Sequence, residues 1–380
     1  MSRDVTVRTV QTRHERETFI RLPWRLYRSD PNWVPPLLAD MRRTLTDAGN
    51  AQFRAGPYAL ALAWREVPGG RPEPVGRVVA GVNEALNRAK GAATGYISLF
   101  ESVEDYEVAR ALFDWAAGWL RARGCVSVKG PVSPTNGDDF RGLLVMGFDS
   151  PPVLMDSYNP PYYADFFERY GFTKDIDLYA YRYRREAMPE RYDRVVAYAM
   201  RRYGFRCDRL NLKDLDRDIR DIKAVLDLAM PEEWADLIPP TLEELRELGR
   251  TLRPLADPCL SYVARSDSGE PIGFLIGLPN YNEVLARLNG RLFPTGFVKF
   301  LWYRRRIRSV RVFVLFVVPE WRKRGVTGAM FWHVWKAAGP RGYEWGEGST
   351  IGETNEEMRR DAERAGGEHY KTYRIYRLDL

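Results

Sequence analysis

A basic, glycine-containing turn follows the most apolar stretch of the chain. Residues 310–318 (VRVFVLFVV) are nearly all apolar, and many are β-branched, which predicts a strand in the middle of a sheet. Residues 319–328 (PEWRKRGVTG) hold three consecutive cations and two glycines, and apolar residues then recur at helical spacing as far as Ala338. The first amides of a helix lack internal partners, and the helix dipole adds partial positive charge there. Because glycine also lets an anion approach the backbone, this turn predicts a diphosphate site.

The turn resembles the cofactor loop of the GNAT acyltransferases, in which Arg or Gln is followed after two residues by Gly and, one residue later, by Gly or Ala. Arg322 and Gly325 match, Thr327 departs from the pattern, and Gly328 follows it. The resemblance implies that acetyl-CoA or another acyl-CoA binds here, with pantetheine paired to the end of the preceding strand. The implied cofactor-binding residues are Val317, Val318, Arg322, Lys323, Arg324, Gly325, Val326, Thr327, Gly328 and Asn355, the last at the start of a later helix. Neither a Walker-type phosphate loop nor a dinucleotide fingerprint is present.

Acyl transfer from a thioester needs a base for the amine, a polarised carbonyl and a proton for the thiolate. The general acid common in the resembled family is a tyrosine four residues before a helix-ending glycine. Phe167 and Ala362 occupy those positions here, so the usual acid is absent from both halves. Tyr373 is our candidate for the acid, and Tyr370 is the alternative.

Glu347 is our candidate for the general base. It follows the predicted strand at residues 343–346, close to where the sheet of the resembled family opens toward the substrate. Glu320 and Glu353 are alternatives, and each of the three acids is also consistent with an ordinary surface role.

An internal repeat organises the elements around this segment. Gly76 and Gly273 each follow a strand and a turn, at an offset of 273 − 76 = 197 residues. Two further landmarks, an asparagine before a helix and a glycine after it, recur at 355 − 159 = 196 and 366 − 171 = 195. The sequence therefore predicts an α/β (α+β) fold of two tandem GNAT-like domains, each a mixed central sheet flanked by helices. We place them at residues 1–187 and 188–380, with the linker near residues 185–189.

The first copy lacks the diphosphate site. Its corresponding strand, residues 96–100, runs into Glu101–Glu107, which carries four carboxylates and neither glycine nor cation. Ser102 and Asp105 are expected to form a capping box that consumes the free amides of the helix. We predict that this copy does not bind acyl-CoA and instead supports the other copy or shapes the substrate cleft.

Bulk properties narrow the class of protein. The chain has 380 residues, a net charge of +7 and 45% hydrophobic residues, as expected for a globular protein with anionic partners. A polar N-terminus predicts no secretory leader, and no apolar run is long enough to span a membrane, which favours a cytoplasmic location. Three scattered cysteines and three histidines predict neither a disulfide framework nor a metal site.

Three functions remain open at this point. The first is a CoA-dependent N-acyltransferase, with acetyl-CoA as donor and a small amine or amino-acid-like acceptor. The second is a non-catalytic acyl-CoA or anion-binding protein, and the third is a tRNA-dependent aminoacyl transferase. The basic, aromatic residues 297–311 bear on this choice, since they suit a packed helix, the 3′-phosphate of CoA, nucleic acid or an anionic membrane surface. Nucleic acid ranks below the first two, and the sequence does not define the oligomeric state.

Overall fold

The computed structural model describes residues 5–134, 139–185, 192–230 and 239–380. The chain folds into two compact units. The N-terminal unit comprises Met1–Leu178, Val284–Leu301 and Lys371–Leu380, and the C-terminal unit comprises Tyr179–Glu283 and Trp302–Tyr370. The predicted boundary at 187/188 and most of the predicted linker lie outside the described residues.

The N-terminal unit has a mixed sheet with helices on both faces. Its elements are β1 (Val5–Thr9), α1 (Arg13–Leu26), α2 (Leu38–Thr44), α3 (Ala51–Arg54), β2 (Tyr58–Arg65), β3 (Glu73–Val82), α4 (Glu84–Lys90), β4 (Thr94–Ser102), α5 (Tyr106–Arg121), β5 (Ser127–Gly130), β6 (Leu143–Met146), α6 (Tyr162–Tyr170) and the first part of β7 (Thr173–Arg184). β1 to β4 are antiparallel, β4 and β5 are parallel, and the end of β13 (Glu368–Asp379) pairs with β5 and β6.

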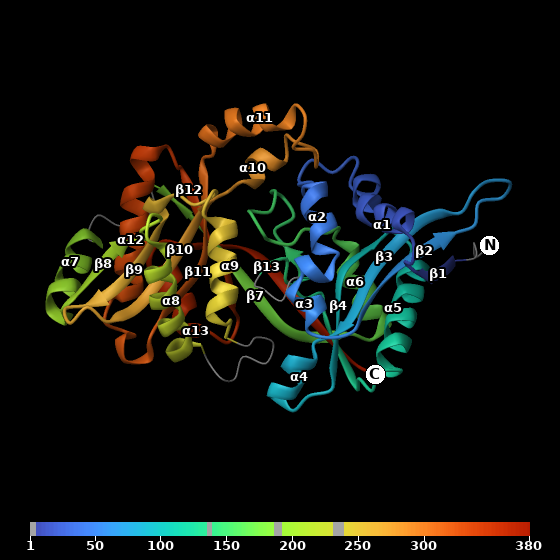
Figure 1. The fold of residues 1–380 in the computed structure, drawn as a ribbon, viewed down its shortest axis with the longest axis horizontal. Coiled ribbons are helices and arrows are strands. Elements are labelled where there is room, and N and C mark those ends of the chain that lie inside the picture. The colour runs from blue at the N-terminus through green and yellow to red at the C-terminus, as the bar shows by residue number, and fades with distance from the viewer. Residues whose placement is uncertain (1–4, 135–138, 186–191, 231–238) are drawn as a thin grey trace. The chain divides into compact units, whose positions relative to one another are not determined.

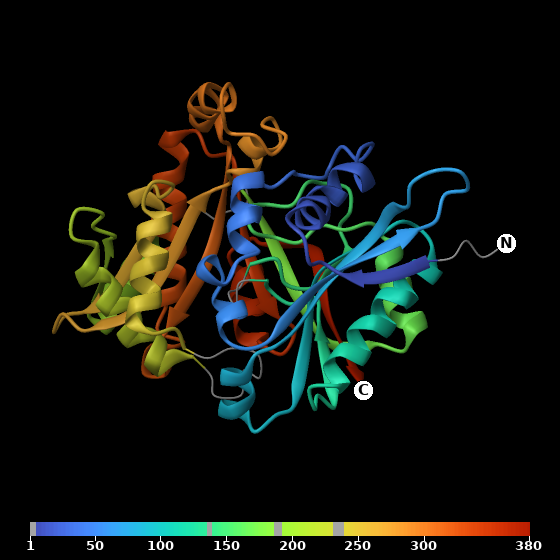
Figure 2. The same cartoon turned by 45° about the vertical axis from the view of Figure 1, so that its right-hand side comes forward.

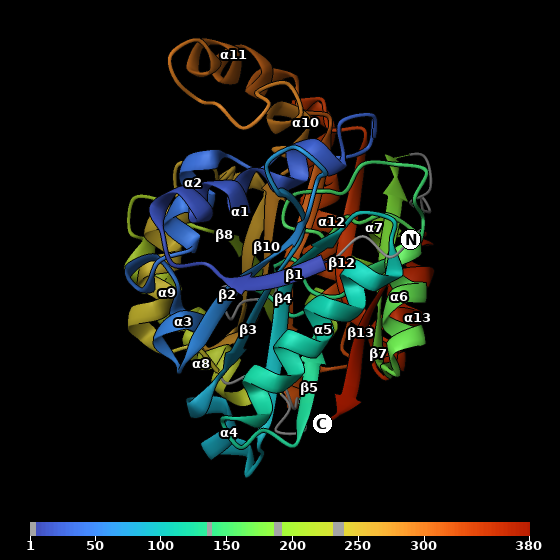
Figure 3. The same cartoon turned by 90° about the vertical axis from the view of Figure 1, so that its right-hand side faces the viewer.

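Alternation along the strands creates two cores in this unit. Ala61 and Val78 belong to the cluster under α5, whereas Leu60 and Val79 belong to the cluster under α1. Successive side chains of a strand point to opposite faces of the sheet, so α1 and α5 cover opposite faces (Figure 2; Figure 3).

The C-terminal unit repeats this plan (Figure 1). Its elements are the end of β7, α7 (Tyr192–Tyr203), β8 (Phe205–Arg209), α8 (Leu215–Ala229), α9 (Leu242–Leu252), β9 (Ser261–Ser266), β10 (Pro271–Pro279), β11 (Ser309–Val317), α12 (Val326–Ala338), β12 (Trp345–Gly352), α13 (Glu356–Arg364) and the start of β13; α10 (Asn282–Leu285) and α11 (Gly296–Tyr303) lie in the connection between β10 and β11. β8 to β11 are antiparallel, and β11 is parallel to β12. The predicted strand at 310–318 and helix at 326–338 are confirmed within one residue.

One local prediction in the first copy is wrong. α5 is capped by Asp105, whose side chain accepts a hydrogen bond from the Glu107 amide, while the Ser102 hydroxyl donates to the Val103 carbonyl. Ser102 is the last residue of β4, so its backbone still follows the strand and cannot cap a helix that begins at Tyr106.

The described residues contain no helix with the length and hydropathy needed to cross a bilayer. Within the same residues, no group of three or more His, Cys, Asp or Glu side chains is arranged to hold a metal ion.

Candidate active site

β11 and β12 separate part-way along their length. Their parallel pairing runs from Ser309↔Trp345 to Val312↔Gly348. β11 then continues to Val317 and β12 to Gly352, beyond the paired positions. A wedge therefore opens between two neighbouring strands of one sheet, toward the end of β11 that leads into the basic turn.

A β-bulge lies where the wedge begins. On the other side of β11, Ile276 pairs with Val314 but Gly277 pairs with Val312, which leaves Phe313 as an extra residue. A bulge takes the extra residue out of the regular ladder and re-aims the backbone next to it. Backbone donors freed in this way can stabilise negative charge that develops on a carbonyl oxygen.

The part of β11 that borders the wedge has apolar side chains that are not fully buried. Val312 to Phe316 are all half-exposed, although each is a strongly hydrophobic residue in the middle of a sheet. The preceding strand residues, Ser309 to Arg311, are buried. A central strand with an accessible apolar surface is suited to hold an extended, partly apolar ligand.

The basic turn has the geometry expected of an anion site. Lys323 and Gly325 have positive φ angles of 60° and 82°, and Gly325 is the N-cap of α12. Glycine has no side chain with which to cap the helix, and the first intrahelical bond of α12 runs from the Ala329 amide to the Gly325 carbonyl, at 2.9 Å. The amides of Val326, Thr327 and Gly328 precede that bond and thus have no intrahelical acceptor.

The three cations of the turn have different roles. Lys323 and Arg324 are exposed, and the Arg324 guanidinium lies 5.1 Å from the centroid of the Trp321 ring. Arg322 is turned toward the protein, where it donates to the carbonyls of Val317 (3.3 Å) and Ala229 (3.1 Å). Arg322 therefore holds the turn against the end of β11 and the end of α8, although part of its side chain is exposed, whereas Lys323 and Arg324 make no such bond to a backbone carbonyl among the described contacts.

Three other predicted cofactor residues lie at the ends of elements. Val317 ends β11 and pairs with Gly273. The Val318 amide donates to Ile272 and its carbonyl accepts from Trp321, so Val318 shapes the turn through bonds within the protein. Asn355 does open the later helix, α13, but its side chain caps that helix by accepting from the Met358 amide at 3.2 Å.

α7 borders the start of α12. A Cβ atom built on Gly325 would lie 2.9 Å from the Ala199 side chain, and one on Gly328 would lie 3.0 Å from the Tyr192 hydroxyl. Larger residues at either position would press against α7, so the two glycines permit α7 and a ligand to approach the same helix end.

The two predicted catalytic residues belong to different units. Glu347 lies on β12 in the C-terminal unit, next to Arg311 in the register, and is fully buried. Tyr370, the alternative acid, donates a hydrogen bond from its hydroxyl to Glu347 Oε2. Tyr373 belongs to the N-terminal unit, where its buried hydroxyl donates to Asp156 Oδ2 at 3.3 Å. Within the C-terminal unit the structure thus pairs Glu347 with Tyr370, and sequence spacing gave no signal for this contact.

The other proposed bases lie elsewhere. Glu320 is exposed in the short 3-10 turn before the cations, and Glu353 is half-exposed after β12. Arg311 is buried beside Glu347 and donates from Nε to Ser349 Oγ at 3.1 Å, so the face of the sheet that holds Glu347 also holds a positive charge.

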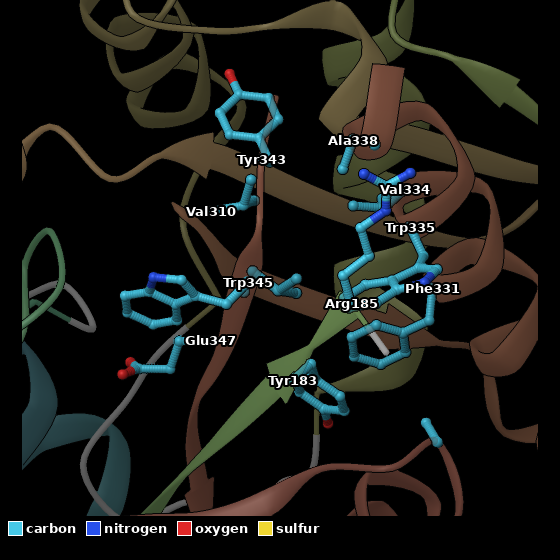
Figure 4. Close-up of a pocket in the computed structure, with 14 residues that line it drawn as sticks. Tyr183, Arg185, Val310, Phe331, Val334, Trp335, Ala338, Tyr343, Trp345 and Glu347 are labelled. Carbon is cyan, nitrogen blue, oxygen red and sulfur yellow. The ribbon is translucent and has the colours of Figure 1, made fainter. Parts of the chain in front are cut away.

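A pocket with about 560 Å³ of empty space, part of it open to solvent, lies between α12 and the strands (Figure 4). Apolar side chains dominate its wall, including Val312 at the start of the wedge and Phe331, Val334 and Trp335 of α12. Figure 4 shows Trp345 and Glu347 directed to the other side of β12 from the α12 residues. Burial raises the pKa of the Tyr183 hydroxyl, which also lines the pocket and therefore stays neutral.

The N-terminal copy has the same wedge, but protein side chains occupy it. β4 and β5 pair only from Thr94↔Ser127 to Tyr96↔Lys129, and the register with β3 shifts between Arg77 and Val79. At the end of β4, the Ser102 amide donates to the Tyr163 hydroxyl (2.7 Å), and the Tyr162 hydroxyl donates to the Ser102 carbonyl (3.0 Å). Two tyrosines of α6 therefore bond to backbone atoms of β4, at the place that corresponds to the ligand-accessible end of β11.

A buried carboxylate completes this network. Glu101 accepts hydrogen bonds from Tyr27 (2.7 Å) and Tyr163 (2.9 Å) and lies 3.4 Å from Arg77. Burial raises the pKa of Glu101, although the Arg77 charge opposes the shift.

Tyr163→Phe tests whether this network is structural. The substitution leaves the Ser102 amide without its buried acceptor and removes one of the two hydroxyls that donate to Glu101 Oε2, so we expect the free energy of unfolding to fall by about 1–3 kcal/mol. Acyl-CoA affinity should be unchanged, because the binding residues lie on other elements. Urea unfolding and calorimetric titration check the two parts. Weakened acyl-CoA binding by a folded Tyr163→Phe protein would contradict the structural role.

Comparisons with known proteins give a consistent assignment. The chain is 33% identical over 386 aligned residues to the bacterial ceramide synthase of Caulobacter vibrioides, covering 99% of this chain and 98% of that protein. It is 31% identical to protein YghO of Escherichia coli, covering 98% and 95%. Among solved structures, a tandem GNAT protein from the clavulanic acid biosynthesis pathway matches with a TM-score of 0.59 and 13% identity, over 99% of this chain and 98% of that one. The chain belongs to the same family as these two relatives, the bacterial ceramide synthase and YghO, and its fold is that of tandem GNAT proteins.

These comparisons confirm the resemblance to tandem GNAT proteins and the α/β fold class that the sequence predicts. No protein-family model matches the chain.

Proposed function

We propose that this tandem GNAT protein transfers a long acyl chain from acyl-CoA to the amino group of a long-chain amino alcohol. The observation that carries the proposal is the wedge between β11 and β12, with a bulge at its start and an uncapped helix end at its mouth. The relative named bacterial ceramide synthase supports the choice of acceptor, since a ceramide is an N-acylated long-chain amino alcohol. The sequence alone predicted acetyl-CoA and a small amine, and the apolar pocket beside the wedge favours a longer chain.

Acyl-CoA, when bound, supplies the activated acyl thioester. The amides of Val326, Thr327 and Gly328, with Lys323 and Arg324, would hold its diphosphate, and the half-exposed residues of β11 would line its pantetheine arm. These residues suit the ligand because they combine uncapped helix amides, exposed cations and an apolar strand surface.

Glu347 would accept the proton of the attacking amine. The Tyr370 hydroxyl fixes the orientation of the carboxylate through its hydrogen bond to Oε2. The bulge at Phe313 would direct backbone donors toward the carbonyl oxygen. The sequence-based prediction of Tyr373 as general acid stays a prediction, and no step of this proposal depends on it.

Thiol release by the purified protein tests the proposal. We expect release from hexadecanoyl-CoA only when an amine such as sphinganine is added, and much slower release with acetyl-CoA and small amines. Binding of acyl-CoA without release in any amine mixture would instead support a non-catalytic binding protein. Transfer that requires aminoacyl-tRNA would support the third function.

Filling the pocket tests the acyl-chain assignment separately. Ala338→Phe adds a ring to the pocket wall, so we expect the ratio of kcat/KM for hexadecanoyl-CoA to that for acetyl-CoA to fall at least ~10-fold, as a lost apolar subsite costs ~1–3 kcal/mol. Ala337→Phe, on the same helix but not part of the pocket wall, is the matched control. An unchanged ratio in a folded Ala338→Phe protein would place the acyl chain elsewhere.

A further inference from the structure

The connection that contains α11 exposes apolar side chains to solvent. Phe293, Phe297, Val298, Leu301 and Trp302 are 72%, 44%, 69%, 43% and 60% exposed. They make up five of the fourteen large hydrophobic residues that are exposed in the described part of the chain, within a stretch of ten residues. We call residues 291–306 the exposed aromatic segment.

The exposed side chains form a continuous surface. Phe297 and Leu301, and likewise Val298 and Trp302, are four residues apart on α11, so each pair lies on neighbouring turns of the helix. The Phe293 ring stacks on the Phe297 ring, with centroids 5.9 Å apart and planes within 8°. Phe293, which precedes the helix, therefore extends the same apolar surface.

Positive charge surrounds this surface. Between residues 284 and 308 the chain has seven cations and no acidic residue. Lys299 lies on the helix, and Arg304, Arg305 and Arg306 follow it directly, all four exposed. The Arg306 guanidinium lies 4.7 Å from the centroid of the Trp302 ring, so cationic and aromatic side chains lie next to each other in this segment.

This combination defines the chemistry of the partner. An apolar surface alone would suit a protein, and cations alone would suit nucleic acid. Aromatic and aliphatic side chains that project between cations favour the boundary between lipid headgroups and acyl chains, where apolar groups insert while arginine and lysine contact phosphate.

We propose that the exposed aromatic segment binds the surface of a bilayer that contains anionic phospholipid. The apolar face of α11 enters the headgroup boundary, and Lys299 with Arg304–Arg306 contacts lipid phosphates. This inference does not depend on the acyl acceptor or on catalysis, because vesicle binding is measured without turnover.

Co-sedimentation of the full chain with vesicles tests the proposal. We expect binding to phosphatidylcholine vesicles that contain about 30% phosphatidylglycerol, weak binding to pure phosphatidylcholine, and loss of affinity as salt is raised. Val298→Ser with Trp302→Ser should lower the partition coefficient at least ~10-fold, because both side chains leave the membrane-facing surface.

Two control variants make the result specific. Val126→Ser with Leu228→Ser removes side chains of similar exposure, 63% and 64%, and should bind as the wild type does. Arg304→Gln with Arg305→Gln should weaken binding to anionic vesicles and leave the thermal unfolding curve unchanged. Equal vesicle binding by wild type and the Val298/Trp302 variant, or wild-type binding to tRNA in preference to vesicles, would overturn the proposal.

Discussion

Glu347→Gln is expected to lower the rate of amide formation by about 10²–10⁴-fold, the range that a general base contributes. The glutamine side chain would keep the size and hydrogen-bonding reach of the glutamate but could not accept a proton. The hydroxyl of Tyr370 could still donate to the amide oxygen, so we expect the fold and acyl-CoA affinity to be retained. Single-turnover measurements with preformed acyl-CoA complex separate the chemical step from binding.

The two acids that the sequence offered as alternatives provide the matched controls. Glu320→Gln and Glu353→Gln remove the same charge from less buried positions and should leave the rate within about twofold of the wild type. Tyr370→Phe should reduce kcat with little change in the KM for acyl-CoA. The substitution removes the hydrogen bond that orients the Glu347 carboxylate and leaves the diphosphate site intact. A large loss in either control with normal activity of Glu347→Gln would move the base to that residue.

Lys323→Glu with Arg324→Glu is expected to weaken acyl-CoA binding by roughly 100-fold. Each charge-assisted contact with phosphate contributes about 1.5–3 kcal/mol, and about 1.4 kcal/mol corresponds to a tenfold change in affinity. Both side chains are exposed, and neither holds the turn to β11 or α8; the substitution also removes the contact of the Arg324 guanidinium with the Trp321 ring within the turn. Arg322 is left unchanged because it holds the turn to Val317 and Ala229.

Calorimetric titration with CoA measures this loss of affinity. The same titration with dephospho-CoA, which lacks the 3′-phosphate, shows whether the two cations contact the diphosphate. Lys213→Glu with Arg217→Glu makes the same change in net charge at exposed positions in and just before α8 of the same unit and should bind CoA normally. Equal affinities in all three proteins would remove the diphosphate from the turn before α12.

The strand, the turn and the helix of the site were predictable because residues close together in the sequence determine each of them. The apolar run at 310–318, the cations and Gly325 lie within sixteen residues, and the strand, turn and helix were each correctly predicted. Gly325 is also the N-cap of this helix, and its positive φ is a conformation that favours glycine.

The rest depends on contacts between distant residues. The bulge at Phe313 can be seen only from the pairing register of β10 with β11. The wedge can be seen only from the position at which β11 and β12 stop pairing. The bond from Tyr370 to Glu347 joins two strands that are separated by α13, so spacing along the chain did not distinguish Tyr370 from Tyr373. The Ser102 cap was predicted incorrectly because the sequence does not show how far β4 extends.

The strand that completes the N-terminal sheet has a consequence for how the protein is made. Lys371–Leu380 belong to the N-terminal unit, and Tyr376–Asp379 pair with Ser127–Gly130. A ribosome therefore delivers this strand only after it has synthesised the whole C-terminal unit. Until then β5 lacks this neighbour, so a nonsense codon just before Tyr376 would damage the part of the protein that is made first.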